Sequence, residues 1–320
     1  MESRREGMTE GAWQERHGRV SSFLLSSLRT AAGRYIARSD AFLGDVLRHR
    51  GVPFEHLEPE DQDYTLADSV VEMCEQSGSS EGLAAAAVTV AAISKMFPTR
   101  SFKTSWKCLE VWRKRHPAKE APAMPHLLAC ACANWCLLAG KPAVAATILL
   151  CFAGLLRVSE ALSLRGNDVH FADSKLIVVL NETKRGVHQK VLYSDSRLIK
   201  WFTLYDQLVR EKSGDARYCP VSYGVFQRWF RKSAIALGST MEWSSHSLRR
   251  GGATEMQRRH VPLTDIMAAG RWASARSAKE YLRKGDIALL RHEASLDVEY
   301  IARLQNFACI GEEAWGLAVP

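Results

Sequence analysis

Residues 244–281 of this chain read SSHSLRRGGATEMQRRHVPLTDIMAAGRWASARSAKEY. His246 and Arg249 are three positions apart, so on a helix they lie on one face and point toward a common spot. Trp272 is followed nine residues later by Tyr281, inside a segment whose pattern is typical of a helix. An imidazole, a guanidinium, an indole and a phenol in one short span are an unusual set for a hydrophobic core. They indicate a polar site.

A phosphodiester is the target that suits these side chains. When a tyrosine attacks a phosphodiester, negative charge builds up on the non-bridging oxygens, which two arginines can hold in bidentate fashion. An imidazole can move the proton of the phenol, an indole N–H can only donate, and a lysine can protonate the leaving oxygen. We therefore expect a second arginine and a lysine elsewhere in the chain.

Arg157 is the candidate for the second arginine. It follows residues 147–156, which are apolar nearly throughout and predict a buried helix. An arginine beside such a run is uncommon unless it is paired. Glu160 lies three positions later and is the expected partner.

Lys184 is the candidate lysine. It lies in residues 173–193, which alternate and are rich in β-branched side chains around a polar break at 181–186. This pattern predicts a β-hairpin, with Lys184 at its tip or just past the first strand, where a long side chain can reach over a cleft. Arg185 and Lys190 are competitors for this role.

Taken in order, these segments resemble the tyrosine recombinases of the phage-integrase type. The resemblance rests on GLLRVSEALSLRGNDV, ETKRG, HSLRRGGAT, AGRW and the final Tyr281, and it covers residues 120–300. It implies a mainly α-helical protein with a small β-hairpin or sheet, in which a small helical DNA-binding domain precedes the catalytic domain. The catalytic residues that it implies are Arg157, Lys184, His246, Arg249, Trp272 and Tyr281, with Glu160 in support.

The activity that this resemblance implies is site-specific cleavage and rejoining of double-stranded DNA through a 3′-phosphotyrosyl intermediate. It implies no cofactor and no metal ion, because the arginines supply the charge that magnesium would otherwise supply. Self-association into a dimer or tetramer on DNA is expected, in the nucleus of a eukaryote or otherwise in the cytoplasm or nucleoid. Arg250, the Gly251-Gly252 pair and GRW are more similar to eukaryotic mobile-element (crypton-like) members than to bacterial phage integrases.

Two other functions stay open on the sequence. A DNA-binding protein derived from such an element keeps the fold but no longer cuts, and a type IB-like topoisomerase uses similar chemistry to relax DNA. Tyr300 is a rival nucleophile, but it lies within an amphipathic stripe, where core packing is the default. A metal-dependent nuclease is disfavoured because no spaced trio of carboxylates stands out.

Composition is compatible with a nucleic-acid partner. The formal net charge of +8 and the pI near 9.1 fit a polyanion without proving one. Three of the eight cysteines, at 130, 132 and 136, fall in an apolar helical run without a matching His/Cys pair, so we expect buried thiols and no zinc. The start of the chain lacks the apolar core of a signal peptide, and the apolar stretches are too short to span a membrane.

We expect four parts along the chain: an N-terminal helical arm over 1–60, a helical core-DNA-binding domain over 61–116, a linker over 117–125, and a catalytic domain with a C-terminal helix over 126–310. The linker prediction rests on three prolines. A further acidic linker is expected at residues 54–64. The C-terminal helix has a stripe suited to its own packing or to a neighbouring subunit.

Cations crowd the last helix of the predicted DNA-binding domain. Trp106 and Trp112 are interleaved with them, and we interpret both tryptophans as core residues. A second basic set, Arg228, Arg231 and Lys232, is either a solvated face or a phosphate contact. The DNA-contact candidates are Lys103, Lys107, Arg113, Lys114, Arg115 and Arg250.

Overall fold

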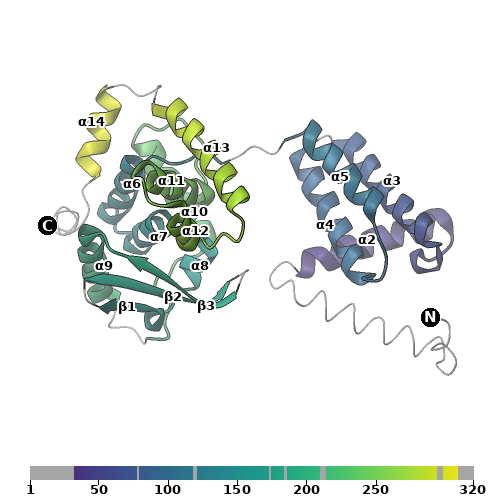
Figure 1. The fold of residues 1–320 in the computed structure, drawn as a ribbon, viewed down its shortest axis with the longest axis horizontal. Coiled ribbons are helices and arrows are strands. Elements are labelled where there is room, and N and C mark those ends of the chain that lie inside the picture. The colour runs from purple at the N-terminus through teal and green to yellow at the C-terminus, as the bar shows by residue number, and fades with distance from the viewer. Residues whose placement is uncertain are drawn as a thin grey trace. The chain divides into compact units, whose positions relative to one another are not determined.

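The computed structural model describes residues 32–77, 79–117, 121–172, 174–183, 186–209, 214–293 and 298–308. It divides into two compact units, Met1–Lys119 and Glu120–Pro320 (Figure 1). Both units are built mainly of helices, and the second also contains a small antiparallel sheet, which confirms the predicted fold class. Within the ranges described, no helix combines the length and apolar character needed to cross a membrane.

Four helices and one 3-10 turn form the described part of the first unit. α3 packs against both α4 and α5, while α2 packs against α4. Leu66, Ile93, Leu109 and Trp112 lie at the centre of their core. The elements are α2 (Ala32–Arg50), η3 (Phe54–His56), α3 (Pro59–Ser77), α4 (Ser80–Met96) and α5 (Lys103–Arg115).

The predicted division near residue 60 is wrong for the described residues. Phe42 and Val46 of α2 are buried in the same core as α3 to α5, so α2 is part of this unit. The acidic segment 54–64, expected to be a linker, contains the buried Phe54, whose ring meets Phe42 edge-on at 5.3 Å. Pro59, Glu60 and Asp61 begin α3, where a proline and acidic residues suit the first turn of a helix.

Asp63 joins α3 to the start of α5. Its carboxylate accepts hydrogen bonds from the backbone N–H of Thr104 at 2.8 Å, and from the N–H and hydroxyl of Ser105 at 2.9 and 2.7 Å. Burial alone would raise the pKa of Asp63, but these donors outweigh it and hold the pKa below its ordinary value. A carboxylate at a helix N-terminus is favoured by capping and by the helix dipole.

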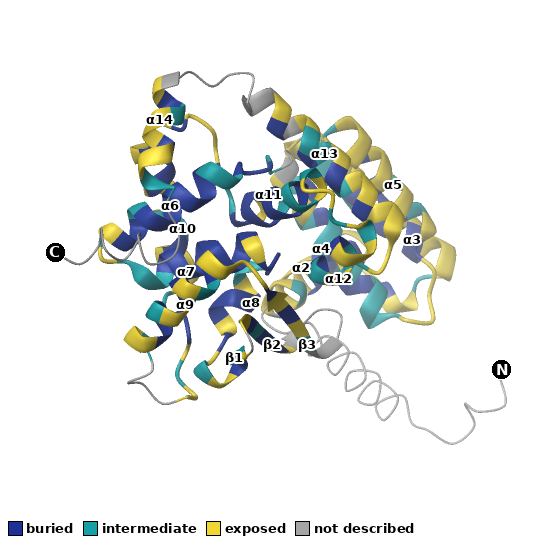
Figure 2. Ribbon diagram, turned by 60° about the vertical axis from the view of Figure 1, so that its left-hand side comes forward, coloured by how far each residue is buried: buried dark blue, intermediate teal, exposed yellow. Residues whose placement is uncertain are grey.

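The second unit is organised around α6, α7 and α11. α6 packs on α7, α11 packs on α7, and α13 covers α11 from outside, and Figure 2 shows α6, α7 and α11 as largely buried. The elements are α6 (His126–Leu138), α7 (Pro142–Ala153), α8 (Val158–Ser163), η4 (Gly166–Asp168), β1 (Val169–Ala172), β2 (Lys175–Thr183), β3 (Gly186–Tyr193), α9 (Ser196–Val209), α10 (Tyr223–Ala236), α11 (Ser245–Arg258), α12 (Leu263–Gly270), α13 (Ala275–Glu293) and α14 (Val298–Phe307).

The sheet has the order β1-β2-β3, with both pairs antiparallel. Val178 of β2 is opposite Val169 of β1 and Val191 of β3, and all three are buried. This period-two alternation places one face of the sheet on the core. The predicted hairpin is therefore confirmed as β2 and β3, and β1 is a third strand added at its edge.

The predicted linker, 117–125, belongs in part to the second unit. Ala123 and Met124 are fully buried, and the N–H of Met124 donates to the carbonyl of Ser247 at 3.0 Å. The prolines limit the backbone conformations of this segment, but they do not make it a linker detached from the domain. The described second half of this segment is thus packed on α11.

The C-terminal helix α14 packs on its own unit. Tyr300 and Leu304 are buried in the main core, and the side-chain amide of Asn134 donates to the carbonyl of Phe307 at 2.8 Å. Tyr300 therefore has the packing role expected of it. The stripe of α14 is covered within the chain in this structure.

Candidate active site

A break between α7 and α8 presents Arg157. The predicted helix over 147–156 is wrong at its end, because α7 stops at Ala153 and Leu155 adopts a left-handed backbone conformation with φ 50°. Arg157 then takes an extended conformation as the N-cap of α8. The side chain of Arg157 is 24% exposed, so it lies at the edge of the core and not inside a helix.

Glu160 is the expected partner of Arg157. Its carboxylate accepts the backbone N–H of Arg157 at 2.8 Å and a guanidinium N–H of Arg157 at 2.6 Å. The two contacts close the first turn of α8 and fix the direction of the arginine side chain. The sequence-based pairing is therefore present in the structure.

Close packing holds the break in place. A Cβ at Gly154 would overlap the hydroxyl of Tyr193, which donates to the carbonyl of Leu150 at 3.4 Å. On the facing helix, a Cβ at Gly252 would overlap the carbonyl of Phe152. Glycine is required at both positions because only its missing side chain permits this approach.

Arg249 is buried on α11, with 5% of its surface exposed. Its two terminal nitrogens donate to the carbonyls of Leu155 and Gly270, and its guanidinium lies 5.2 Å from the ring of Trp272. Burial lowers the pKa of Arg249 to about 10, and the nearby charge of Arg271 acts in the same direction. Arg249 therefore stays charged at neutral pH while it ties the ends of α7 and α12 to α11.

Arg271 is a site residue that sequence reasoning missed. It caps α12 in a left-handed conformation with φ 55°, and its guanidinium donates to Glu160 at 2.6 Å and to the carbonyl of Leu155 at 3.1 Å. Burial lowers its pKa, and the carboxylate of Glu160 opposes this shift. The available signal was an arginine directly after the helix-ending Gly270, within the AGRW segment.

Tyr281 lies on α13 beside Trp272, with 5.1 Å between the ring centroids. Its hydroxyl is buried and makes no hydrogen bond of normal geometry with the described residues. Burial raises the pKa of Tyr281, and the positive charges of Arg250 and Arg249 oppose that rise. The phenol therefore sits within the field of the arginine cluster.

Arg250, predicted to contact DNA, lies against Tyr281 in the structure. Its guanidinium lies 4.7 Å from the ring of Tyr281 and donates to the carbonyl of Ala121 at 2.6 Å. The side chain is turned inward because α13 covers α11 at this point. These contacts place Arg250 beside Tyr281, and its contact with DNA stays a prediction.

The remaining predicted residues differ in position. His246 is exposed on the first turn of α11, one turn before Arg249. Lys184 lies outside the described residues, between β2 and β3. The structure thus brings together Arg157, Glu160, Arg249, Trp272 and Tyr281, and it adds Arg271.

The cations of α5 form an exposed face of the first unit. Lys107 and Lys114 both pair with Glu110, at 3.3 and 2.8 Å. The prediction that both tryptophans are core residues is half wrong, since Trp112 is buried and Trp106 is 40% exposed. The exposed cations are Lys103, Lys107, Arg113, Lys114 and Arg115.

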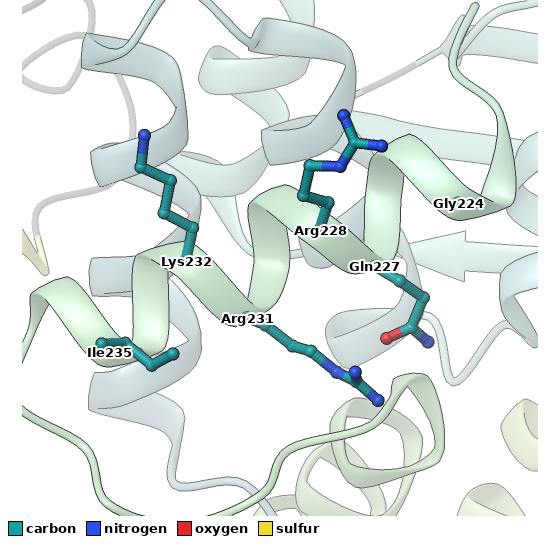
Figure 3. Close-up of a pocket in the computed structure, with 6 residues that line it drawn as sticks. All are labelled: Gly224, Gln227, Arg228, Arg231, Lys232 and Ile235. Carbon is teal, nitrogen blue, oxygen red and sulfur yellow. The ribbon is translucent and has the colours of Figure 1, made fainter.

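A second basic surface lies on α10. Figure 3 shows Gln227 and Arg231 extending to one side of the helix, and Arg228 and Lys232 extending to the other. The shallow depression beside them has a volume of about 460 Å³. The ammonium of Lys232 also lies 4.9 Å from the ring centroid of Trp229, which orients it by a cation–π contact.

Comparison with known proteins gives one family match. Residues 131–286 match the model of the phage integrase family, and this range contains every predicted catalytic position from Arg157 to Tyr281. The matched range lies within the second unit. No curated protein matches the chain in sequence.

Several solved structures resemble the chain. The XerA recombinase is 16% identical, with 87% of this chain and 97% of that chain covered at a TM-score of 0.44. The XerH site-specific recombinase on its difH substrate is 14% identical, with 75% and 73% covered at 0.48. The Tn1549 transposon integrase with transposon end DNA is 12% identical, with 86% and 100% covered at 0.49.

Proposed function

We propose that the phage integrase family domain at residues 131–286 cleaves and rejoins DNA strands through a 3′-phosphotyrosyl intermediate, as the recombinase or integrase of a mobile element. The observation that carries the proposal is the cluster around one phenol. Tyr281 packs on Trp272, the guanidinium of Arg249 lies on the same indole, and the charges of Arg249 and Arg157 act on the phenol.

In the proposed reaction, the Tyr281 oxygen bonds to the scissile phosphorus and the bond to the 5′-oxygen breaks. Arg157 and Arg249 hold the non-bridging oxygens as negative charge grows on them. The phosphotyrosyl bond keeps the energy of the broken bond, so a 5′-hydroxyl can attack it and rejoin the strands. Since the hydroxyl of Tyr281 is buried here, cleavage requires a movement of α13 that exposes it to DNA.

Two protons move in this scheme. His246, exposed at the start of α11, receives the phenolic proton or hands it on. Lys184 protonates the leaving 5′-oxygen, a role that is supported by the resemblance to the tyrosine recombinases and by its position between the two hairpin strands. Trp272 donates a hydrogen bond to the phosphate and packs the site.

Double-stranded DNA is the proposed partner, held through its backbone. The exposed cations of α5 and the basic surface of α10 supply phosphate contacts that bind without reading sequence. Affinity should therefore fall steeply as salt rises. We also propose that several copies assemble on DNA, since strand exchange joins two sites.

The proposed origin is a eukaryotic mobile element of the crypton-like kind. Support comes from Arg250, the Gly251-Gly252 pair and the GRW segment at 270–272. In the structure, Arg250 lies on the ring of Tyr281, so part of this signature belongs to the site.

A nicked suicide substrate tests the proposal. A pool of duplexes with a nick near each candidate phosphate lets the short fragment diffuse away, so an active protein accumulates as a covalent adduct and reports its target sequence. We expect an adduct with the full chain, none with Tyr281→Phe, and an adduct with the control Tyr300→Phe. Because no metal ion takes part in the proposed reaction, the adduct should also form in the presence of EDTA.

The same assays distinguish the two alternative functions, a silent DNA-binding protein and a type IB-like topoisomerase. Salt-dependent DNA binding without an adduct from any substrate in the pool contradicts the cleavage proposal and identifies a silent DNA-binding protein. An adduct together with plasmid relaxation, but no joined product from two sites, identifies a type IB-like topoisomerase.

A further inference from the structure

Glu160 is shared by two arginines from distant parts of the chain. One carboxylate oxygen accepts the Arg157 guanidinium, and the other accepts both the backbone N–H of Arg157 and the Arg271 guanidinium. Arg157 is 24% exposed at its side chain, whereas Arg271 is only 5% exposed. Arg271 therefore lies behind Arg157 and contacts it through the carboxylate.

Arg271 also meets Arg249 at a shared acceptor. The carbonyl of Leu155 accepts from the guanidinium of each. This carbonyl is turned toward them because Leu155 has a left-handed backbone, and Arg271 has one too. Non-glycine residues in this conformation are strained and persist where the surroundings hold them. Leu155 and Arg271 both adopt it, and both take part in the hydrogen bonds at the Leu155 carbonyl.

The charges of the cluster do not balance. Arg157, Arg249 and Arg271 supply three positive charges and Glu160 supplies one negative charge, so these four side chains carry a net charge of +2. Like charges in a partly buried site repel one another strongly. A phosphoryl group, whose oxygens gain negative charge during attack, would relieve this repulsion most in the transition state.

We infer that Arg271 is a positioning residue of the cleavage site: through Glu160 and the Leu155 carbonyl it fixes both phosphate-binding arginines in one geometry. This inference rests on the proposed function. Arg271 is buried, so its own guanidinium does not touch DNA. It acts on the reaction by orienting Arg157 and by raising the positive potential at the phosphate.

Arg271→Gly and Arg271→Lys test the inference. Glycine adopts the left-handed backbone without strain, so this variant removes the side chain and relaxes the turn. Lysine keeps the charge but lacks the planar fork that reaches two acceptors. His260 is a matched control, since it is exposed and also left-handed, with φ 58°. His260→Gly should cleave as wild type.

The readout is single-turnover cleavage of the selected nicked duplex, beside DNA affinity. We expect Arg271→Gly to cleave about 100-fold more slowly, in line with the cost of a misplaced catalytic group, with affinity unchanged. Arg271→Lys should lie between glycine and wild type. A substrate with a neutral methylphosphonate at the scissile position should shrink the loss in both variants, because one anionic oxygen is gone.

The outcomes separate the two proposals. Wild-type cleavage together with wild-type rates in both Arg271 variants overturns this inference alone, as does an equal loss on phosphate and methylphosphonate. If Arg271→Gly does not fold, the methylphosphonate ratio of Arg271→Lys decides. If wild type itself forms no adduct, the proposed function fails. The rise in melting temperature that inorganic sulfate causes then tests whether Arg271 shapes the arginine cluster. Loss of that rise in Arg271→Lys supports the inference, and an unchanged rise overturns it.

Discussion

Two buried carboxylates, Asp63 in the first unit and Glu160 in the second, show how differently one chemical group is used. Asp63 accepts hydrogen bonds from neutral donors, the backbone and hydroxyl groups at the start of α5. Glu160 accepts from two guanidinium groups and one backbone N–H. Neutral donors complete a local cap. Charged donors in excess leave a positive site that an anion can complete.

The largest expected difference is in cleavage. Glu160→Gln keeps the shape of the side chain, but its NH2 group faces a guanidinium and can no longer accept from it. We expect single-turnover cleavage to fall about 100-fold, within the range for loss of a preorganised contact. Asp63→Asn, measured with saturating DNA, should cleave at close to the wild-type rate.

A partly exposed carboxylate of the second unit, whose arginine partner is exposed, is the control for this prediction. Glu255 pairs with Arg259 four residues along α11, at 2.7 Å. Such surface pairs contribute little, so Glu255→Gln should have no effect on cleavage. Equal losses in Asp63→Asn and Glu160→Gln would contradict the division of roles between the two carboxylates.

Asp63, which we expect to matter little for cleavage, should matter for the stability of the first unit. Asp63→Asn places an NH2 group against donors that need an acceptor, and we expect a loss of about 2 kcal/mol in the free energy of unfolding of that unit. Urea unfolding followed by tryptophan fluorescence would measure it. Asp68→Asn, an exposed position on α3, is the control and should leave the midpoint unchanged.

The pH dependence of that loss has a definite sign. The folded pKa of Asp63 lies below the ordinary 3.8, so its contribution is complete above pH 3.8 and disappears as the pH falls through the folded value. The gap in unfolding free energy between wild type and Asp63→Asn should therefore be constant near neutral pH and shrink below about pH 4. A gap that grows in acid would refute the assignment.

The smallest expected effect concerns the cations around Tyr281. Arg250 opposes the rise in the pKa of Tyr281, so Arg250→Met should raise that pKa further. Cleavage removes the phenolic proton, so the rise of the cleavage rate with pH should move to higher pH in this variant, by less than about one unit. Arg259→Met, on the exposed side of α11, is the comparison. An unmoved limb in Arg250→Met would show that this cation does not act on the nucleophile.

Local pattern predicted much of the fold. The hairpin followed from alternation, and Trp112 could have been separated from Trp106 by spacing, since Ser105, Leu109 and Trp112 form one buried stripe on α5. The end of α7 could not be predicted in this way. It depends on packing of Gly154 against β3 and on hydrogen bonding of Leu155 to Arg249, which is 94 positions away.

The same difference between local pattern and long-range contact applies to the candidate site. Arg157 and Glu160 are three positions apart, so their pairing was visible in the sequence. Arg271 meets Glu160 across 111 positions, and only the folded chain brings them together. Arg250 was predicted to contact DNA, and its position on the ring of Tyr281, where α13 packs on α11, followed only from the folded chain.

Mass spectrometry of the peptide joined to DNA tests the central claim most directly. After trapping on a nicked duplex, the adduct is digested with protease and nuclease, and the tyrosine that retains the nucleotide is located by fragmentation. The account predicts a single modified residue, Tyr281, joined to a 3′-phosphate. A nucleotide on Tyr300 or on any other residue, or a 5′-phosphate at Tyr281, would contradict it.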